Sequence, residues 1–175
     1  MLNKFYPNYM FESVEQIPFN LIHSQRIKGI MFDMDNTLVN GKYVHTKELK
    51  SWIKEMKKQG IKMCIFSNTP RINKVKMVSK DLGMQYIYNG FKPFKFGFKK
   101  AEKLLDVDKE NIVIIGDQLF TDIYGGNRYG IKTILVTPIE EKEVFVTKLK
   151  RPIEKMVIKK YKETNEYKES LKMVK

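Results

Sequence analysis

The stretch KGIMFDMDNTL at residues 28–38 decides the fold. Residues 28–34 make a short apolar run typical of a buried strand, and Asp33 and Asp35 stand at its carboxyl end. Two carboxylates two residues apart are costly to hold together without a cation, and a hard divalent ion with oxygen ligands would offset their repulsion. The stretch therefore predicts a cation site. A calcium loop is excluded because Leu38 stands where such a loop needs glycine.

Short apolar runs and amphipathic helical stretches alternate after this strand. The runs predict further strands at 61–66, 86–88, 111–116 and 131–136, and the amphipathic stretches predict helices at 46–59, 71–82, 97–105 and 119–129. Thr46 is a suitable N-cap for the first helix, and Gly60 is placed to end it. This alternation favours a Rossmann-like α/β fold of three layers, with helices on both faces of a mainly parallel central sheet.

Polar residues follow the predicted strands in a chemically coherent set. In a parallel α/β sheet, ligands bind outside the carboxyl ends of the strands. Carboxylates gathered there suit Mg²⁺, whereas a lysine and a hydroxyl suit a phosphoryl group at that ion. An aspartate can also accept the phosphoryl group as a nucleophile. The residues at these positions are Asp33, Asp35, Ser67, Asn68, Lys92, Asp117 and Asp122.

Four strings in chain order carry a family resemblance. FDMDNTL, FSN at 66–68, the pair Lys92-Pro93 and GDQLFTD at 116–122 resemble the four motifs of the haloacid dehalogenase superfamily. More closely, DNTLV, the KP pair before a phenylalanine-bearing helix, and GDQLFTDIYGGNRYG resemble the YqeG family of type IIIA phosphatases. This likeness covers about residues 1–160.

The resemblance implies catalytic roles. Asp33 would attack phosphorus and form an aspartyl-phosphate, while Asp35 would protonate the leaving alcohol and then activate water. Ser67 would hydrogen-bond the transferred phosphoryl group, and Lys92 would neutralise its charge. Asn68 is placed with these phosphate-binding residues, with support of the site as its alternative role.

The resemblance also implies a Mg²⁺ cofactor. Asp33 and Asp117 would bind the ion through side-chain oxygens, and Asp35 through its backbone carbonyl. Asp122 would act at the metal, directly or through water, or orient Lys92.

The spacing of the motifs leaves no room for a cap domain, either between Asp33 and Ser67 or between Ser67 and Lys92. We therefore expect an open site that suits a bulky substrate. The YqeG family is similar to mitochondrial phosphatidylglycerophosphate phosphatases, which implies dephosphorylation of this anionic lipid at the inner face of the cytoplasmic membrane. One alternative is a phosphatase for a soluble or protein-borne phosphoester. Another is a non-catalytic basic module that binds nucleic acid or a ribosome, although no nucleic-acid motif is recognisable.

Composition limits the class of protein. The 175 residues suit one ordinary domain, and a single cysteine, Cys64, excludes a disulfide scaffold. The net charge of +13 concentrates anionic partners such as phosphorylated substrates. We find no apolar run of transmembrane length and no signal peptide, and so we expect a cytoplasmic protein, with peripheral contact at the membrane as a further possibility.

Three segments are expected: an extension at 1–26 that packs on the core or contacts membrane, the phosphatase core at 27–147, and a basic helical tail at 148–175. The tail places Ile153, Met156, Val157 and Tyr161 on one predicted helical face. Residues 91–103 hold four phenylalanines and five lysines. Among these, Phe98 is expected in the core, whereas Phe94 and Phe96 are hard to bury in a short loop. For the extension at 1–26, for residues 91–103 and for the tail at 148–175, membrane contact and packing on the domain remain alternatives.

Overall fold

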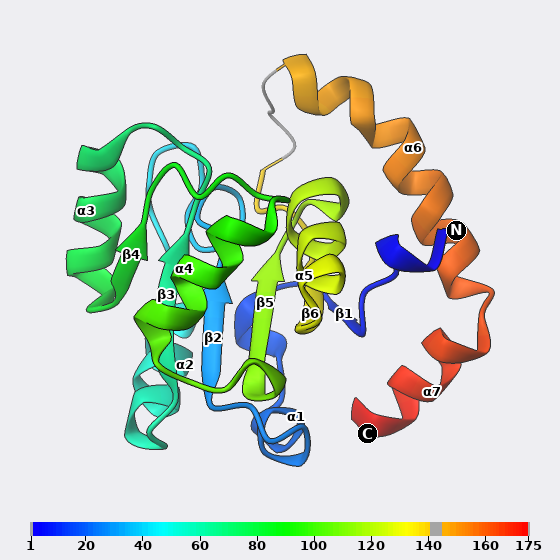
Figure 1. The fold of residues 1–175 in the computed structure, drawn as a ribbon, viewed down its shortest axis with the longest axis horizontal. Coiled ribbons are helices and arrows are strands. Elements are labelled where there is room, and N and C mark those ends of the chain that lie inside the picture. Colours follow the sequence, from blue (N-terminus) through cyan, green and yellow to red (C-terminus); the bar gives the residue numbers. More distant parts are fainter. Residues whose placement is uncertain (1, 141–144, 175) are drawn as a thin grey trace.

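A single parallel sheet organises the molecule. The computed structural model describes residues 2–140 and 145–174, with side chains for 2–140 and 152–173. Six strands lie in the order β1-β6-β5-β2-β3-β4, and all five pairings are parallel (Figure 1). The strands are β1 (Tyr9–Phe11), β2 (Gly29–Phe32), β3 (Lys62–Phe66), β4 (Gln85–Ile87), β5 (Ile112–Gly116) and β6 (Lys132–Val136). The predicted Rossmann-like α/β fold is confirmed.

Helices cover both faces of this sheet. The α-helices are α1 (Phe19–Ser24), α2 (Lys47–Lys58), α3 (Ile72–Leu82), α4 (Lys95–Leu105), α5 (Tyr124–Tyr129), α6 (Phe145–Lys162) and α7 (Asn165–Val174). Shorter turns are η1 (Leu2–Phe5), η2 (Val14–Gln16), η3 (Lys109–Asn111) and the π-helical η4 (Leu119–Ile123). Successive side chains of a strand point to opposite faces. Accordingly, Ile30 and Phe32 of β2 pack with α1, α2 and α3, whereas Met31 packs with α4 (Figure 1).

Local signals account for several boundaries. The Thr46 side chain accepts a hydrogen bond from the Leu49 amide at 3.0 Å, so this residue caps α2 as predicted. Gly83 ends α3 in the left-handed conformation that glycine adopts at no steric cost. Cys64 of β3 is completely buried, and this burial raises the pKa of its thiol to about 12.

Two elements differ from the sequence prediction. The single helix expected at 119–129 is divided into η4 and α5, because the amides of both Asp122 and Ile123 point to the Gln118 carbonyl and widen the first turn. The other difference is β1, a three-residue strand that pairs with β6 at the edge of the sheet. With Val14 and Ile17 also buried, this N-terminal segment is built into the sheet and its core.

The C-terminal helices lie beside the N-terminal segment, at the β1 edge of the sheet (Figure 1). Val157 and Tyr161 of α6 are buried, whereas Ile153 and Met156 are exposed, so the four residues expected on one face separate into an inner pair and an outer pair. Across residues 2–140 and 145–174, we find no helix with both the length and the apolar character needed to cross a membrane.

Candidate active site

The carboxyl ends of three central strands bring the predicted site residues together. Strand β2 lies between β3 and β5, with Phe32 opposite Ile65 on one side and Ile115 on the other. The Asp33 amide extends this pairing by donating to the Ile115 carbonyl at 2.9 Å. The next residue after each of these strands is Asp33, Ser67 or Asp117. Parallel pairing thus carries residues that are far apart in the chain to one edge of the sheet.

Three carboxylates form a compact buried cluster at this edge. Asp33, Asp117 and Asp122 each offer an oxygen, and these oxygens all lie within 4.8 Å of one another. Asp122 is completely buried. The Asp122 side chain packs directly against Gly116, where an added Cβ atom would lie only 2.3 Å from the Asp122 Oδ2. Glycine at 116 is therefore a steric requirement of the cluster.

Lys92 joins two members of this cluster. Its Nζ donates to the Asp33 Oδ1 at 2.6 Å and to the Asp122 Oδ1 at 2.7 Å. Burial alone lowers the pKa of Lys92, but the carboxylates of Asp122 and Asp33 outweigh this effect and raise the pKa above its ordinary value. Lys92 is therefore a fixed cation beside the acidic residues and stays protonated near neutral pH.

Asn68 holds the backbone of Lys92. Its Oδ1 accepts from the Lys92 amide at 2.7 Å, and its Nδ2 donates to the Lys92 carbonyl at 2.9 Å. The structure thus places the Asn68 side chain on the Lys92 peptide, in the supporting position that was one of its two expected roles. Ser67 is buried, and its Oγ accepts from the Thr69 amide at 3.1 Å, which leaves the Ser67 hydroxyl proton available to another acceptor.

Asp35 lies further toward the surface than Asp33. Its pKa is raised, first by burial and then by the Asp33 charge, while Lys74, Lys92 and Arg71 act in the opposite direction. A raised pKa favours the protonated form that an acid catalyst needs. Arg71, which the sequence placed after the second motif, therefore acts electrostatically on this site.

Two supports of the site come from distant parts of the chain. The Thr37 hydroxyl donates to the Asp117 Oδ1 at 3.3 Å. The Glu154 Oε1 of α6 accepts from the Leu119 amide at 3.2 Å, at the start of the turn that carries Asp122. Glu154 has no role that can be predicted from the sequence, because it lies 35 residues from Leu119 and its neighbours in the chain give no sign of the contact.

The cluster has the properties of a site for a hard divalent cation. The Asp33 Oδ2 is buried and has no hydrogen-bond partner among the described residues. Burial, followed by the charges of Asp33 and Asp122, raises the pKa of Asp117 well above its ordinary value. Burial likewise raises the pKa of Asp122. The negative charges of these neighbouring carboxylates repel one another, and a divalent cation would relieve this repulsion. The donors are all oxygens, and one of them has no partner among the described residues, which fits Mg²⁺.

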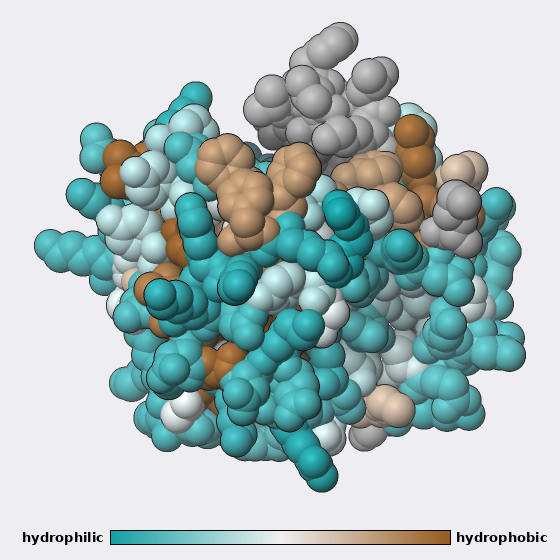
Figure 2. Space-filling view, in the orientation of Figure 1, coloured by the Kyte–Doolittle hydropathy of each residue, from teal (hydrophilic) through white to brown (hydrophobic). Residues whose placement is uncertain are grey.

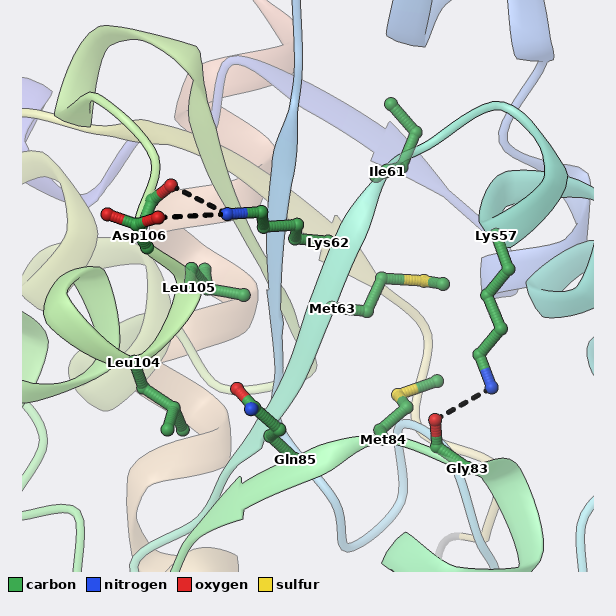
Figure 3. Close-up of a pocket in the computed structure, with 10 residues that line it drawn as sticks. All are labelled: Lys57, Ile61, Lys62, Met63, Gly83, Met84, Gln85, Leu104, Leu105 and Asp106. Carbon is green, nitrogen blue, oxygen red and sulfur yellow. Dashed lines mark hydrogen bonds and ion pairs between the residues drawn. The ribbon is translucent and has the colours of Figure 1, made fainter.

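A separate pocket of about 420 Å³ opens where β3 and β4 begin, at the amino ends of these strands and so away from the carboxyl ends that carry the acidic cluster (Figure 3). Its charged groups are already paired. The Lys57 Nζ donates to the carbonyls of Leu82 and Gly83, and the Lys62 Nζ lies 3.2 Å from the Asp106 Oδ2. This pocket is thus remote from the acidic cluster, and its polar groups serve the packing of α2, α3 and α4.

Comparison with known proteins places the chain in a family. Residues 30–92 match the model of the haloacid dehalogenase-like hydrolases, and residues 91–151 match a second model, HAD-hydrolase-like. The chain is 39% identical over 160 residues to "Probable phosphatase YqeG" of Bacillus subtilis (strain 168), covering 90% of this chain and 92% of that protein.

One more distant relative and one solved structure are also similar to this chain. "Phosphatidylglycerophosphate phosphatase 1, chloroplastic/mitochondrial" of Arabidopsis thaliana is 25% identical over 165 residues, which are 89% of this chain and 47% of that protein. The fold resembles a crystal structure of an uncharacterised protein from Listeria monocytogenes serotype 4b, with a TM-score of 0.52 and 22% identity, covering 77% of this chain and 99% of the other. The chain therefore belongs to the haloacid dehalogenase-like hydrolases and is a phosphatase of the YqeG family, acting on a phosphorylated substrate.

Proposed function

We propose that this phosphatase hydrolyses a phosphomonoester with Mg²⁺, through an aspartyl-phosphate on Asp33. The observation that carries the proposal is the arrangement around Asp33. One oxygen accepts from the buried Lys92, and the other, beside two further carboxylates, has no hydrogen-bond partner in the part of the chain that the structure describes. Asp33, Asp117 and Asp122 would hold the ion with side-chain oxygens. The backbone carbonyl of Asp35 would add a ligand. When bound, Mg²⁺ supplies Lewis-acid stabilisation of the phosphoryl charge.

In the first step, a carboxylate oxygen of Asp33 forms a bond to phosphorus while the bond from phosphorus to the substrate alcohol breaks. Asp35 gives its proton to the departing oxygen. Its raised pKa supports this role, because burial and the Asp33 charge keep more of the carboxyl protonated.

In the second step, the Asp35 carboxylate takes a proton from water as the water oxygen bonds to phosphorus. The bond between phosphorus and Asp33 breaks, inorganic phosphate leaves, and both aspartates return to their starting states. Lys92 neutralises the phosphoryl oxygens throughout, and Ser67 donates its free hydroxyl proton to one of them. Asn68 keeps the Lys92 peptide in place.

We further propose that the substrate is phosphatidylglycerophosphate and the product phosphatidylglycerol, at the inner face of the cytoplasmic membrane. The Arabidopsis relative is named for this activity. Residues 33–92, all of which are described, hold only α2, β3, α3 and β4 with their loops, and hence no cap domain. A large substrate can therefore reach Asp35 from the surface.

The test is phosphate release from phosphatidylglycerophosphate in mixed micelles, compared with a sugar phosphate and a nucleotide. We expect the lipid rate to exceed both others greatly, and chelation of Mg²⁺ to abolish it. Asp33→Asn should lower the rate by about 10⁴-fold or more, whereas the control Asp106→Asn, at an exposed carboxylate, should not. Equal rates on the three substrates would refute the lipid assignment. Full activity of Asp33→Asn would refute the mechanism.

A further inference from the structure

Three phenylalanines beside the active site are exposed together. Phe91, Phe94 and Phe96 are 51%, 57% and 50% exposed, and we call them the phenylalanine patch. The ring centroids of Phe91 and Phe96 are 5.3 Å apart, and those of Phe94 and Phe96 are 6.1 Å apart. Figure 2 shows hydrophobic side chains gathered on the surface near the start of α4. Phe98, one turn further along, is buried in the core, as expected from the sequence.

The phenylalanine patch is rigidly joined to the catalytic edge. The Gly90 amide donates to the Ser67 carbonyl at 2.8 Å, directly before the patch begins. A Cβ atom on Gly97 would lie 1.9 Å from the Gly90 carbonyl oxygen, so the start of α4 sits against this loop. Phe91 immediately precedes Lys92, whose peptide is held by Asn68. A surface that binds through the patch is therefore held at a fixed position relative to Asp33.

The charged residues next to the phenylalanine patch in the sequence are all lysines. Lys95, Lys99 and Lys100 are exposed, and the first acidic residue after the patch is Glu102. The Lys100 Nζ lies 5.9 Å from the centroid of the Phe96 ring. Aromatic rings that enter a headgroup boundary, surrounded by lysines that meet lipid phosphates, are the usual chemistry of a peripheral contact with an anionic bilayer.

We propose that the phenylalanine patch docks on an anionic lipid bilayer, with the rings in the interface and the lysines on phosphates, and so presents a lipid-borne phosphomonoester to Asp33. This inference rests on the proposed lipid substrate. A bilayer fits better than single-stranded nucleic acid. The rings of Phe94 and Phe96 already stack on each other, with an interplanar angle of 18°, instead of standing apart to receive bases.

The test uses the full chain with Phe94→Ser and Phe96→Ser together. Serine is a favoured N-cap, and Phe94 is the N-cap residue of α4, so the change preserves the start of this helix. The control is Met77→Ser with Leu171→Ser, which removes two exposed apolar side chains elsewhere on the surface. Sedimentation with phosphatidylcholine vesicles, with and without about a third of phosphatidylglycerol, measures binding.

We expect the wild type and the control to bind the anionic vesicles, and salt to weaken the binding. The patch variant should bind about tenfold more weakly or worse, and should lose lipid hydrolysis while keeping its turnover of para-nitrophenyl phosphate. Unchanged vesicle binding by the patch variant overturns the proposal, as does binding of the wild type to RNA but not to vesicles. Vesicle binding through the patch without lipid hydrolysis would refute the substrate alone. Equal lipid hydrolysis by the patch variant would refute the docking alone.

Discussion

Replacing Gly116 by alanine tests the packing of the acidic cluster. The new Cβ would lie 2.3 Å from the Asp122 Oδ2, whereas ordinary contacts begin at 3.4 Å, so the carboxylate must move by about 1 Å. The hydrogen bond from Lys92 to the Asp122 Oδ1 is 2.7 Å long, and a shift of this size stretches it beyond bonding range. We expect kcat to fall by about 100-fold and the free energy of unfolding by about 1–3 kcal/mol.

Steady-state hydrolysis of para-nitrophenyl phosphate and urea unfolding measure the two effects. Gly29→Ala is a matched control, because Gly29 is also a buried glycine of the sheet but lies at the amino end of β2. There a Cβ atom would meet the Ile112 and Leu105 side chains at 3.2 and 3.3 Å. The control should lose some stability and keep its kcat. If Gly116→Ala retained the wild-type kcat, the position of Asp122 beside Lys92 would not matter for catalysis, and our reading of the site would fail.

Two further predictions concern the charges of the cluster. Lys92→Met leaves the Asp33 and Asp122 carboxylates without their buried cation. Measured by urea unfolding, this change should lower the free energy of unfolding by about 3–5 kcal/mol in Mg²⁺-free buffer and by less in the presence of Mg²⁺. The same loss in both buffers would show that the Lys92 charge does not interact with a bound Mg²⁺ ion. In a calorimetric scan, Mg²⁺ at 100 times its Kd for the wild type should raise the unfolding free energy of the wild type by about 2.7 kcal/mol. Asp117→Asn should remove most of this gain. A full gain in that variant would exclude Asp117 as a ligand.

The central part of the fold could be predicted because its signals are local. The apolar runs that become β2, β3 and β5 are each followed directly by a polar site residue, and parallel pairing then brings these residues together. The sequence therefore predicts Asp33, Ser67 and Asp117 at one edge of the sheet, where the structure has them. The exposure of Phe94 and the burial of Phe98 also followed from local spacing.

The remaining features depend on partners far along the chain. Strand β1 is three residues long, and only its pairing with β6 makes it a strand. The Glu154 contact with Leu119 depends on how α6 docks, and a helical periodicity does not specify which residue meets the core. In the π-helical turn Asp122 lies against Gly116, and the order of residues does not reveal this contact.

The middle position of β2 has a consequence for thermal inactivation. Edge strands and terminal helices open at lower free energy than a strand that is hydrogen-bonded on both sides. Fraying of β1 or α7 should therefore leave β2, which carries Asp33 at its end, intact. We expect the amide protons of Ile30–Phe32 to exchange with solvent only through unfolding of the whole sheet. We therefore expect the strand that carries Asp33 to persist on heating until the core itself unfolds.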